Sequence, residues 1–242
     1  MSEPAHYNTT TDGLSARAAA LTAGLGLLVM TLCAPVAWFY FIPQVVVQGD
    51  GAATLERFQS APRPYLIGGA LLFVTYLMDI VVAWALYWLL LPDQRAMSLL
   101  AAWMRLIYTG MAFVGLMSTW RVYDYAVRDA VEASDIAIAQ IVHDLAAADS
   151  ANQMALFFFG FHLLVLGVAV WRSVRVPRFI GLAVIIAGAS YIIDYALRYI
   201  APNLAPGWLI LLALGELVFM LWLLIAGWSL NGKAPVQNEI RG

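Results

Sequence analysis

Five ionisable side chains interrupt the long apolar stretches of this sequence, at positions where a charge is costly. They are Asp79, Arg105, His162, Asp194 and Glu216. Ionisable residues within a membrane-spanning helix are expensive to insert, so those that occur mark functional or structural sites. An imidazole and a buried carboxylate can both titrate near neutral pH, which makes His162 and Glu216 candidates for a proton relay. Asp79 and Arg105 can form a counter-ion pair or a gate beside them.

A hydroxyl, a tyrosine and an aspartate recur at the same spacing in two of these stretches. The first reads TYLMD and ends at Asp79, and the second reads SYIID and ends at Asp194. In a helix the three side chains share one face, so Tyr76 joins Asp79 as a candidate binding or relay residue. Asp194 differs because Arg198 follows it at i+4. This spacing favours a local ion pair with a structural role near the membrane surface.

The composition is typical of an integral membrane protein. Apolar residues make up 63% of the chain and charged residues 12%, and the mean hydropathy is +0.80. Soluble domains are about half apolar and about a quarter charged. The net charge of −2 and the lack of a basic block in the sequence give no support to nucleic-acid binding. Cys33 is the only cysteine, which excludes an intrachain disulfide and a cysteine-based metal site.

Six segments are long and apolar enough to cross a membrane, which takes about 20 residues each. They lie at about 18–41, 65–91, 97–121, 153–172, 178–199 and 207–229. No stretch outside them is long enough for a second domain, so we expect residues 1–242 to form a single membrane domain. The sequence therefore predicts an all-α protein, an integral membrane six-helix bundle.

The distribution of lysine and arginine predicts how the spans are oriented. One side of the membrane would hold seven: Arg17, Arg95, Arg172, Arg175, Arg178, Lys233 and Arg241. The other would hold five: Arg57, Arg63, Arg121, Arg128 and Arg198. The short connection WRSVRVPRF carries three arginines and no acid, so its side is expected to be cytoplasmic. We therefore expect a multi-pass protein of the bacterial inner membrane with both termini in the cytoplasm.

The connection between the third and fourth spans has the pattern of a short helix. Ser134 or Asp135 can cap it. An apolar stripe follows, formed by Ile136, Ile138, Ile141, Val142 and Leu145. We expect a short extracytoplasmic helix that covers the bundle or lies on the outer leaflet. A gate or lid over the bundle is the alternative.

The two similar motifs also allow an internal repeat. They lie in the second and fifth spans, which are equivalent positions if the bundle consists of two halves of three spans. Because three is an odd number, such halves cross the membrane in opposite senses, as in many secondary transporters. Two inverted three-helix halves are one arrangement of the bundle, and six helices without a repeat are the other.

Several cofactor and enzyme classes lack the residues that they need in the spans. Lys233 is the only lysine and lies outside them, which excludes a retinal Schiff base. His162 is the only histidine within a span, so a bis-histidine haem or a three-histidine zinc site cannot form there. We expect no cofactor and no metal. A metal site formed by Asp79, His162 and Glu216 is the alternative that these residues leave. The sequence favours a protein that is not an enzyme but leaves the question open.

Three stretches after residue 150 carry a resemblance to a known family. They read FFFGFHLLVLGVAVWRS, VPRFIGLAVIIAGASYIID and GELVFMLWLLIAG. They resemble the bacterial membrane family known as domain of unknown function 4386. The matching positions are Phe159, Gly160, His162, Pro177, Arg178, Phe179, Gly181, Tyr191, Asp194, Gly215, Glu216 and Trp222. Arg105 is similar to an arginine in that family's third span, which often continues Arg-x-x-Glu, whereas this chain has Tyr108. The resemblance implies six spans and these positions, but no activity.

Three functions fit the buried polar residues. The first is a small transporter or permease for protons with a small solute, which would use the candidate relay and the Asp79–Arg105 pair. The second is a non-catalytic membrane subunit, sensor or assembly partner, in which the same charges fix helix packing. The third is an intramembrane enzyme that modifies lipid. The expected partners are the lipid bilayer, a proton or small solute, and either a second copy of the chain or another membrane subunit.

Overall fold

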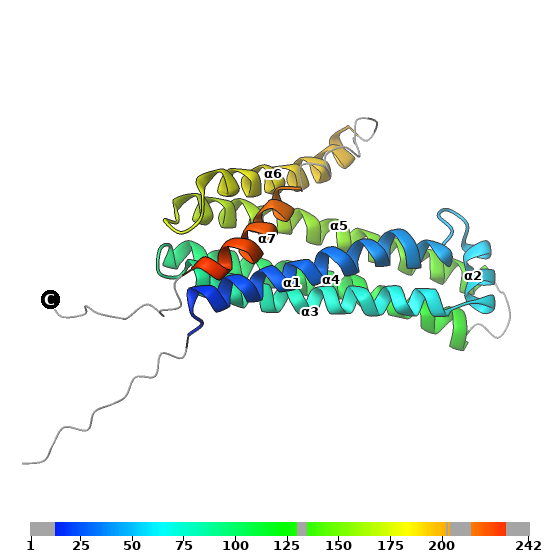
Figure 1. The fold of residues 1–242 in the computed structure, drawn as a ribbon. Coiled ribbons are helices and arrows are strands. Elements are labelled where there is room, and N and C mark those ends of the chain that lie inside the picture. The colour runs from blue at the N-terminus through cyan, green and yellow to red at the C-terminus, as the bar shows by residue number, and fades with distance from the viewer. Residues whose placement is uncertain (1–12, 130–134, 202, 204–213, 231–242) are drawn as a thin grey trace, which may run out of the picture.

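The computed structural model is all-helical over the residues that it describes, which are 13–129, 135–201, 203 and 214–230 (Figure 1). Within these ranges, five helices are long and apolar enough to cross a membrane. Their outward faces are apolar too, since Trp103, Val114 and Met117 of one helix are each more than half exposed. Such surfaces are unfavourable in water and suited to lipid. The chain is therefore a multi-pass membrane protein.

The first span is a helix whose winding changes after a proline. α1 comprises Ala16–Val36 and begins after Ser15, whose hydroxyl accepts a hydrogen bond from the first turn. Pro35 has no backbone N–H to donate, and the chain continues as a π-helix over Ala37–Phe41 and a 3-10 turn over Ile42–Gln44. This segment contains the first predicted span.

Four long helices follow at the next predicted spans. They are α3 (Arg63–Leu90), α4 (Arg95–Tyr123), α5 (Asp135–Arg172) and α6 (Arg178–Ile200). Short connections join α3 to α4 and α5 to α6, so the members of each pair are antiparallel neighbours. A π-helical turn over Asp124–Asp129 extends α4.

The helix predicted between the third and fourth spans is not a separate element. α5 is one helix of 38 residues that contains both the predicted short helix and the fourth span. Residues 146–152 include four alanines and no glycine or proline, so the sequence there does not interrupt a helix. At a rise of ~1.5 Å per residue, α5 is longer than the ~30 Å of a hydrocarbon core. The prediction of a separate extracytoplasmic helix was wrong, because that segment is the projecting start of α5.

A short helix between the first two spans has no counterpart in the prediction. α2 comprises Gly51–Ser60 and begins after Asp50, whose carboxylate accepts a hydrogen bond from the Ala53 amide at 2.9 Å. Leu55 and Phe58 are buried, and α2 packs on the first turns of α5. The projecting part of α5 thus packs against α2, which is too short and too polar to be predicted as a span.

The last helix is shorter than the others. α7 comprises Leu214–Ala226 and continues as a 3-10 turn over Gly227–Ser229. The predicted sixth span, 207–229, begins in residues outside the described ranges. The count of six spans therefore stays a prediction.

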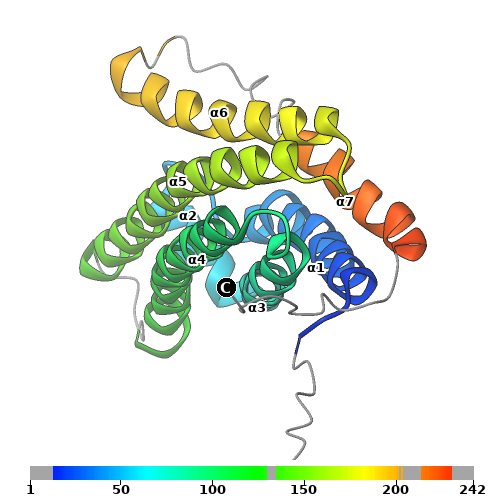
Figure 2. The same cartoon turned by 90° about the vertical axis from the view of Figure 1, so that its left-hand side faces the viewer.

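The six helices other than α2 form a closed ring (Figure 2). Each packs on its neighbour in the sequence, from α1 through α3, α4, α5 and α6 to α7, and α7 packs on α1. Glycines allow the close approach of α5 and α6: Gly160 lies against the backbone of Gly188, and Gly167 against that of Gly181. Side chains that point inward from any of the six helices meet in one interior.

The start of α1 and the end of α7 lie at the same end of the ring (Figure 1). There the Arg17 guanidinium stacks on the Trp228 ring at 4.6 Å. The α3–α4 and α5–α6 connections meet at this end as well, because the Ser173 hydroxyl donates a hydrogen bond to Asp93 at 2.6 Å. We call it the arginine-rich end, since it holds Arg17, Arg95, Arg172, Arg175 and Arg178. The opposite end is called the α2 end.

Candidate functional site

An arginine and an aspartate form an ion pair inside the ring. Arg105 Nη2 lies 2.6 Å from Asp79 Oδ1, and the two side chains are 1% and 0% exposed. Asp79 comes from the middle of α3 and Arg105 from the first half of α4. Neither Asp79 oxygen nor Arg105 Nε takes part in a well-formed hydrogen bond among the described residues. A buried ion pair is favourable only when its remaining polar atoms are satisfied too. Asp79 Oδ2 and Arg105 Nε therefore leave capacity for a further partner.

His162 holds the other side of the same guanidinium. Arg105 Nη1 donates to His162 Nε2 at 3.2 Å, and His162 Nδ1 donates to the Ala101 carbonyl at 2.8 Å. Arginine only donates and a carbonyl only accepts, so these partners assign a neutral imidazole with its proton on Nδ1. His162 thereby connects α5 to α4. We call Asp79, Arg105 and His162 the polar layer.

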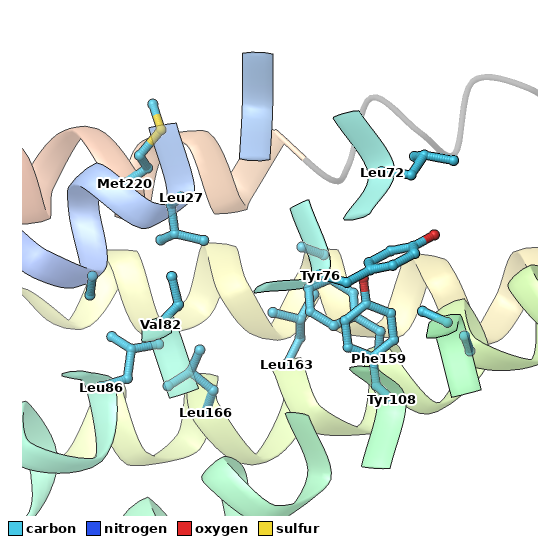
Figure 3. Packing of buried hydrophobic residues seen from close by; sticks show 14 of the residues in the cluster. Leu27, Leu72, Tyr76, Val82, Leu86, Tyr108, Phe159, Leu163, Leu166 and Met220 are labelled. Carbon is cyan, nitrogen blue, oxygen red and sulfur yellow. The ribbon is translucent and has the colours of Figure 1, made fainter. Parts of the chain in front are cut away.

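Aromatic rings lie one helical turn from the polar layer, towards the α2 end. On each of three helices the residue three positions away is aromatic: Tyr76 on α3, Tyr108 on α4 and Phe159 on α5. These three residues, which Figure 3 shows close together, are called the aromatic layer. The Phe159 ring lies 4.7 Å from the Tyr108 ring and 5.4 Å from the Arg105 guanidinium, a cation–π contact. The Tyr108 hydroxyl interacts with the Asp79 carboxylate without the geometry of a hydrogen bond.

Glu216 faces the same interior from the start of α7. Its Oε1 accepts a hydrogen bond from the Tyr191 hydroxyl of α6 at 3.1 Å, and the Tyr191 ring packs on Phe159 at 5.5 Å. Tyr191 is its only hydrogen-bond partner among the described residues. The two members of the predicted proton relay, His162 and Glu216, are thus each bonded to other residues.

A cavity of about 10 Å³ joins Arg105 to Glu216. Residues from all six ring helices line it: Leu27, Leu86, Arg105, Leu163, Leu166, Val184, Glu216 and Phe219. This volume holds one water molecule, and the other lining residues are apolar. The arrangement can bind one small polar species between a guanidinium and a carboxylate, or a proton on the carboxylate.

A second cavity of about 10 Å³ lies nearer the arginine-rich end. It shares Leu86 and Leu166 with the first cavity, and its lining includes Ser98 and His162. Both groups are already bonded, because the Ser98 hydroxyl donates to the Tyr87 carbonyl at 2.8 Å and both nitrogens of His162 have partners. Among the described residues, no three or more His, Cys, Asp or Glu side chains group together as metal ligands.

The two similar motifs have different surroundings. Asp79 pairs across helices, whereas Asp194 Oδ2 accepts a hydrogen bond from Arg198 at 2.9 Å on a partly exposed face of α6. The hydroxyls of Thr75 and Ser190 bond carbonyls of their own helices and not the aspartates. Only the first motif contributes to the polar layer. Whether the two halves of the chain are inverted repeats stays a prediction.

A second interhelical ion pair lies near the α2 end and was not among the predicted site residues. Arg121 Nη2 donates to Asp144 Oδ1 at 2.8 Å, and Asp144 is 0% exposed. Gln140 and His143 contact the same carboxylate. The surrounding sequence is rich in acids, so the buried one could not be told from its exposed neighbours. An apolar stripe including Ile141 of the same helix was the signal that this turn of α5 faces a partner.

Comparison with known proteins gives the chain a family. It matches the family described as Domain of unknown function (DUF4386) over residues 22–227. The chain belongs to the DUF4386 family. The resemblance drawn from the sequence is confirmed, and the match contains Asp79, Arg105, His162 and Glu216.

One curated relative of this DUF4386 protein is described as an uncharacterized protein of Archaeoglobus fulgidus. The two are 31% identical over 170 residues, which are 70% of this chain and 88% of the relative. No solved structure matches the chain.

Proposed function

We propose that this DUF4386 protein is a small transporter that moves protons through a central site formed by Arg105 and Glu216. The observation that carries the proposal is the cavity between these residues, which all six ring helices line. A site shared by every helix is altered when one part of the ring moves against the rest, as alternating access requires. Asp79 Oδ2 and Arg105 Nε, which make no well-formed hydrogen bond among the described residues, add polar capacity for a ligand.

The charges near the cavity favour a proton as the transported ion. One guanidinium, that of Arg105, serves two carboxylates, Asp79 and Glu216, while His162 is neutral. The group has no net charge when Glu216 is protonated and one negative charge when it is not. An uncompensated charge is costly in a low-dielectric interior. A proton that binds to or leaves Glu216 therefore changes the electrostatic attraction between Arg105 and Glu216.

His162 has another role in this proposal than the relay that the sequence predicted. Its Nε2 lone pair accepts from Arg105 and its Nδ1 proton is given to Ala101, so a second proton on the ring would break the contact with Arg105. His162 is then a positioning residue that holds the guanidinium between the two carboxylates.

The transporter is proposed to cross the bacterial inner membrane six times, with α7 as the sixth crossing and both termini in the cytoplasm. The two described ends of the chain lie at one end of the ring, which supports an even number of crossings (Figure 1). The arginines of that end support a cytoplasmic location.

A non-catalytic membrane subunit is the second candidate. It is favoured by the almost complete burial of the Asp79–Arg105 pair and by cavities that are no larger than a water molecule. In that case the charges would serve helix packing alone.

Proton flux in proteoliposomes tests the proposal. With a pH-sensitive dye inside and a potassium diffusion potential imposed by valinomycin, the wild-type chain is expected to move protons without an added solute. Glu216→Gln, which keeps size and polarity, is expected to abolish this flux. Gly110→Ala is the matched control, because nothing lies near the position of its Cβ.

Two results would contradict the transporter. One is wild-type flux no greater than that of protein-free vesicles, and the other is equal flux in wild type and Glu216→Gln. The packing role instead expects no flux and a lower unfolding temperature for Glu216→Gln.

A further inference from the structure

The two cavities lie on the same side of the polar layer. The first, beside Arg105 and Glu216, and the second, nearer the arginine-rich end, meet at Leu86 and Leu166. Figure 3 shows these two leucines next to each other. On the other side of the polar layer stand the buried rings of Tyr108 and Phe159.

The first cavity fits a water molecule and the second does not. A buried water needs two to four polar partners. In the first cavity the guanidinium of Arg105 can donate and the carboxylate of Glu216 can accept, and both line the space. In the second, the polar groups of Ser98 and His162 are already bonded and the remaining lining is mainly apolar.

We infer that Arg105 and Glu216 bind a bridging water molecule, and that this water exchanges with solvent at the arginine-rich end through a hydrophobic gate made by Leu86 and Leu166. An apolar constriction closes by dewetting and opens when it becomes hydrated. The aromatic layer blocks the path to the site from the α2 end. Protons that reach Glu216 in this conformation therefore come from the arginine-rich end. This inference rests on the proposed function, because it names the side from which the transporter's site is reached.

Cysteine modification tests the path, since Cys33→Ser removes the only native thiol. In that background, Val184→Cys places a thiol in the first cavity, and Ala112→Cys places one beyond the aromatic layer, at a residue 1% exposed. Val174→Cys, at a residue 90% exposed in the α5–α6 connection, marks the arginine-rich end. A membrane-impermeant methanethiosulfonate reagent is added to right-side-out and to inverted vesicles.

The expected result is that Val184→Cys reacts only in the vesicles in which Val174→Cys reacts, and that Ala112→Cys does not react from that side. Adding Leu166→Ala is expected to speed the reaction of Val184→Cys by roughly tenfold, which corresponds to ~1.4 kcal/mol of gate energy. Leu166→Val, a smaller change, serves if the alanine variant is not inserted, and a smaller acceleration is then expected.

Reaction of Val184→Cys from the α2 end, or an unchanged rate after either change at Leu166, would overturn the gate. These rates report access and not transport. A chain that shows the expected access but no proton flux therefore contradicts the proposed function, and a chain with flux but the opposite access contradicts only the gate.

Discussion

Arg105 donates a hydrogen bond from Nη1 to Nε2 of His162 over 3.2 Å, inside the ring and across the contact of α4 with α5. The bond requires an unprotonated Nε2, because a guanidinium has no acceptor. The same arginine reaches Asp79 on α3. One side chain of α4 is thus held from both neighbouring helices.

Removing the imidazole is expected to destabilise the protein in proportion to what it leaves unpaired. His162→Leu strands the Arg105 donor and the Ala101 carbonyl, and a buried unsatisfied group costs about 1–3 kcal/mol. His162→Gln keeps a donor and an acceptor and should cost less. Unfolding temperatures of the purified variants in detergent check this order, and equal losses would show that the two hydrogen bonds contribute nothing.

Breaking the Asp79–Arg105 pair on one side is expected to cost more than replacing it on both. Asp79→Leu leaves a buried guanidinium without its carboxylate, and losing one partner of a buried pair typically costs about 3–5 kcal/mol. The double variant Asp79→Leu with Arg105→Met should recover much of that loss. A double variant less stable than either single variant in thermal unfolding would mean that the pair is not the dominant interaction.

The close contact of α5 with α6 is expected to depend on glycine. A Cβ at Gly181 would lie 2.5 Å from the backbone nitrogen of Trp171, which forces the helices apart. Gly181→Ala should therefore lower the unfolding temperature. Gly110→Ala, in open space on α4, should leave it unchanged or raise it, since alanine favours a helix over glycine by about 1 kcal/mol. Equal effects of the two substitutions would contradict the packing.

The ion pair near the α2 end is expected to be structural. Arg121→Gln removes the closest partner of the fully buried Asp144 carboxylate, although Gln140 and His143 still contact it. We expect a lower unfolding temperature with proton flux retained in the variant that still folds. Loss of flux at an unchanged unfolding temperature would place this pair in the transport path instead.

The sequence predicted the helical membrane class and the residues of the site better than it predicted their partners. Long apolar runs identify spans without any knowledge of their neighbours. A charged residue within such a run is rare, so it can be recognised as a site candidate from the sequence alone. Which partner His162 takes depends on how α4 and α5 cross and rotate, and no local pattern contains that angle. The sequence therefore grouped His162 with Glu216 in a relay, whereas the structure bonds His162 to Arg105 and to the carbonyl of Ala101.

The errors in the fold have a physical origin of the same kind. The start of α5 is polar enough to lie outside a membrane, and we therefore predicted a separate helix there. An alanine-rich segment favours a helix inside or outside the lipid, so α5 continues through it. α2 was missed because its ten residues bury only a few side chains. α2 packs on α5, a contact that the sequence does not display.

Glu216 is proposed to be the carboxyl that gains and loses a proton inside the ring. Infrared difference spectroscopy during a pH titration of the reconstituted protein measures this most directly, because a protonated carboxyl has its own C=O band. We predict that wild type shows a buried-carboxyl band that disappears as pH rises, and that Glu216→Gln lacks it while Gly110→Ala keeps it. The same titrating band in wild type and Glu216→Gln would show that another carboxyl takes up the proton.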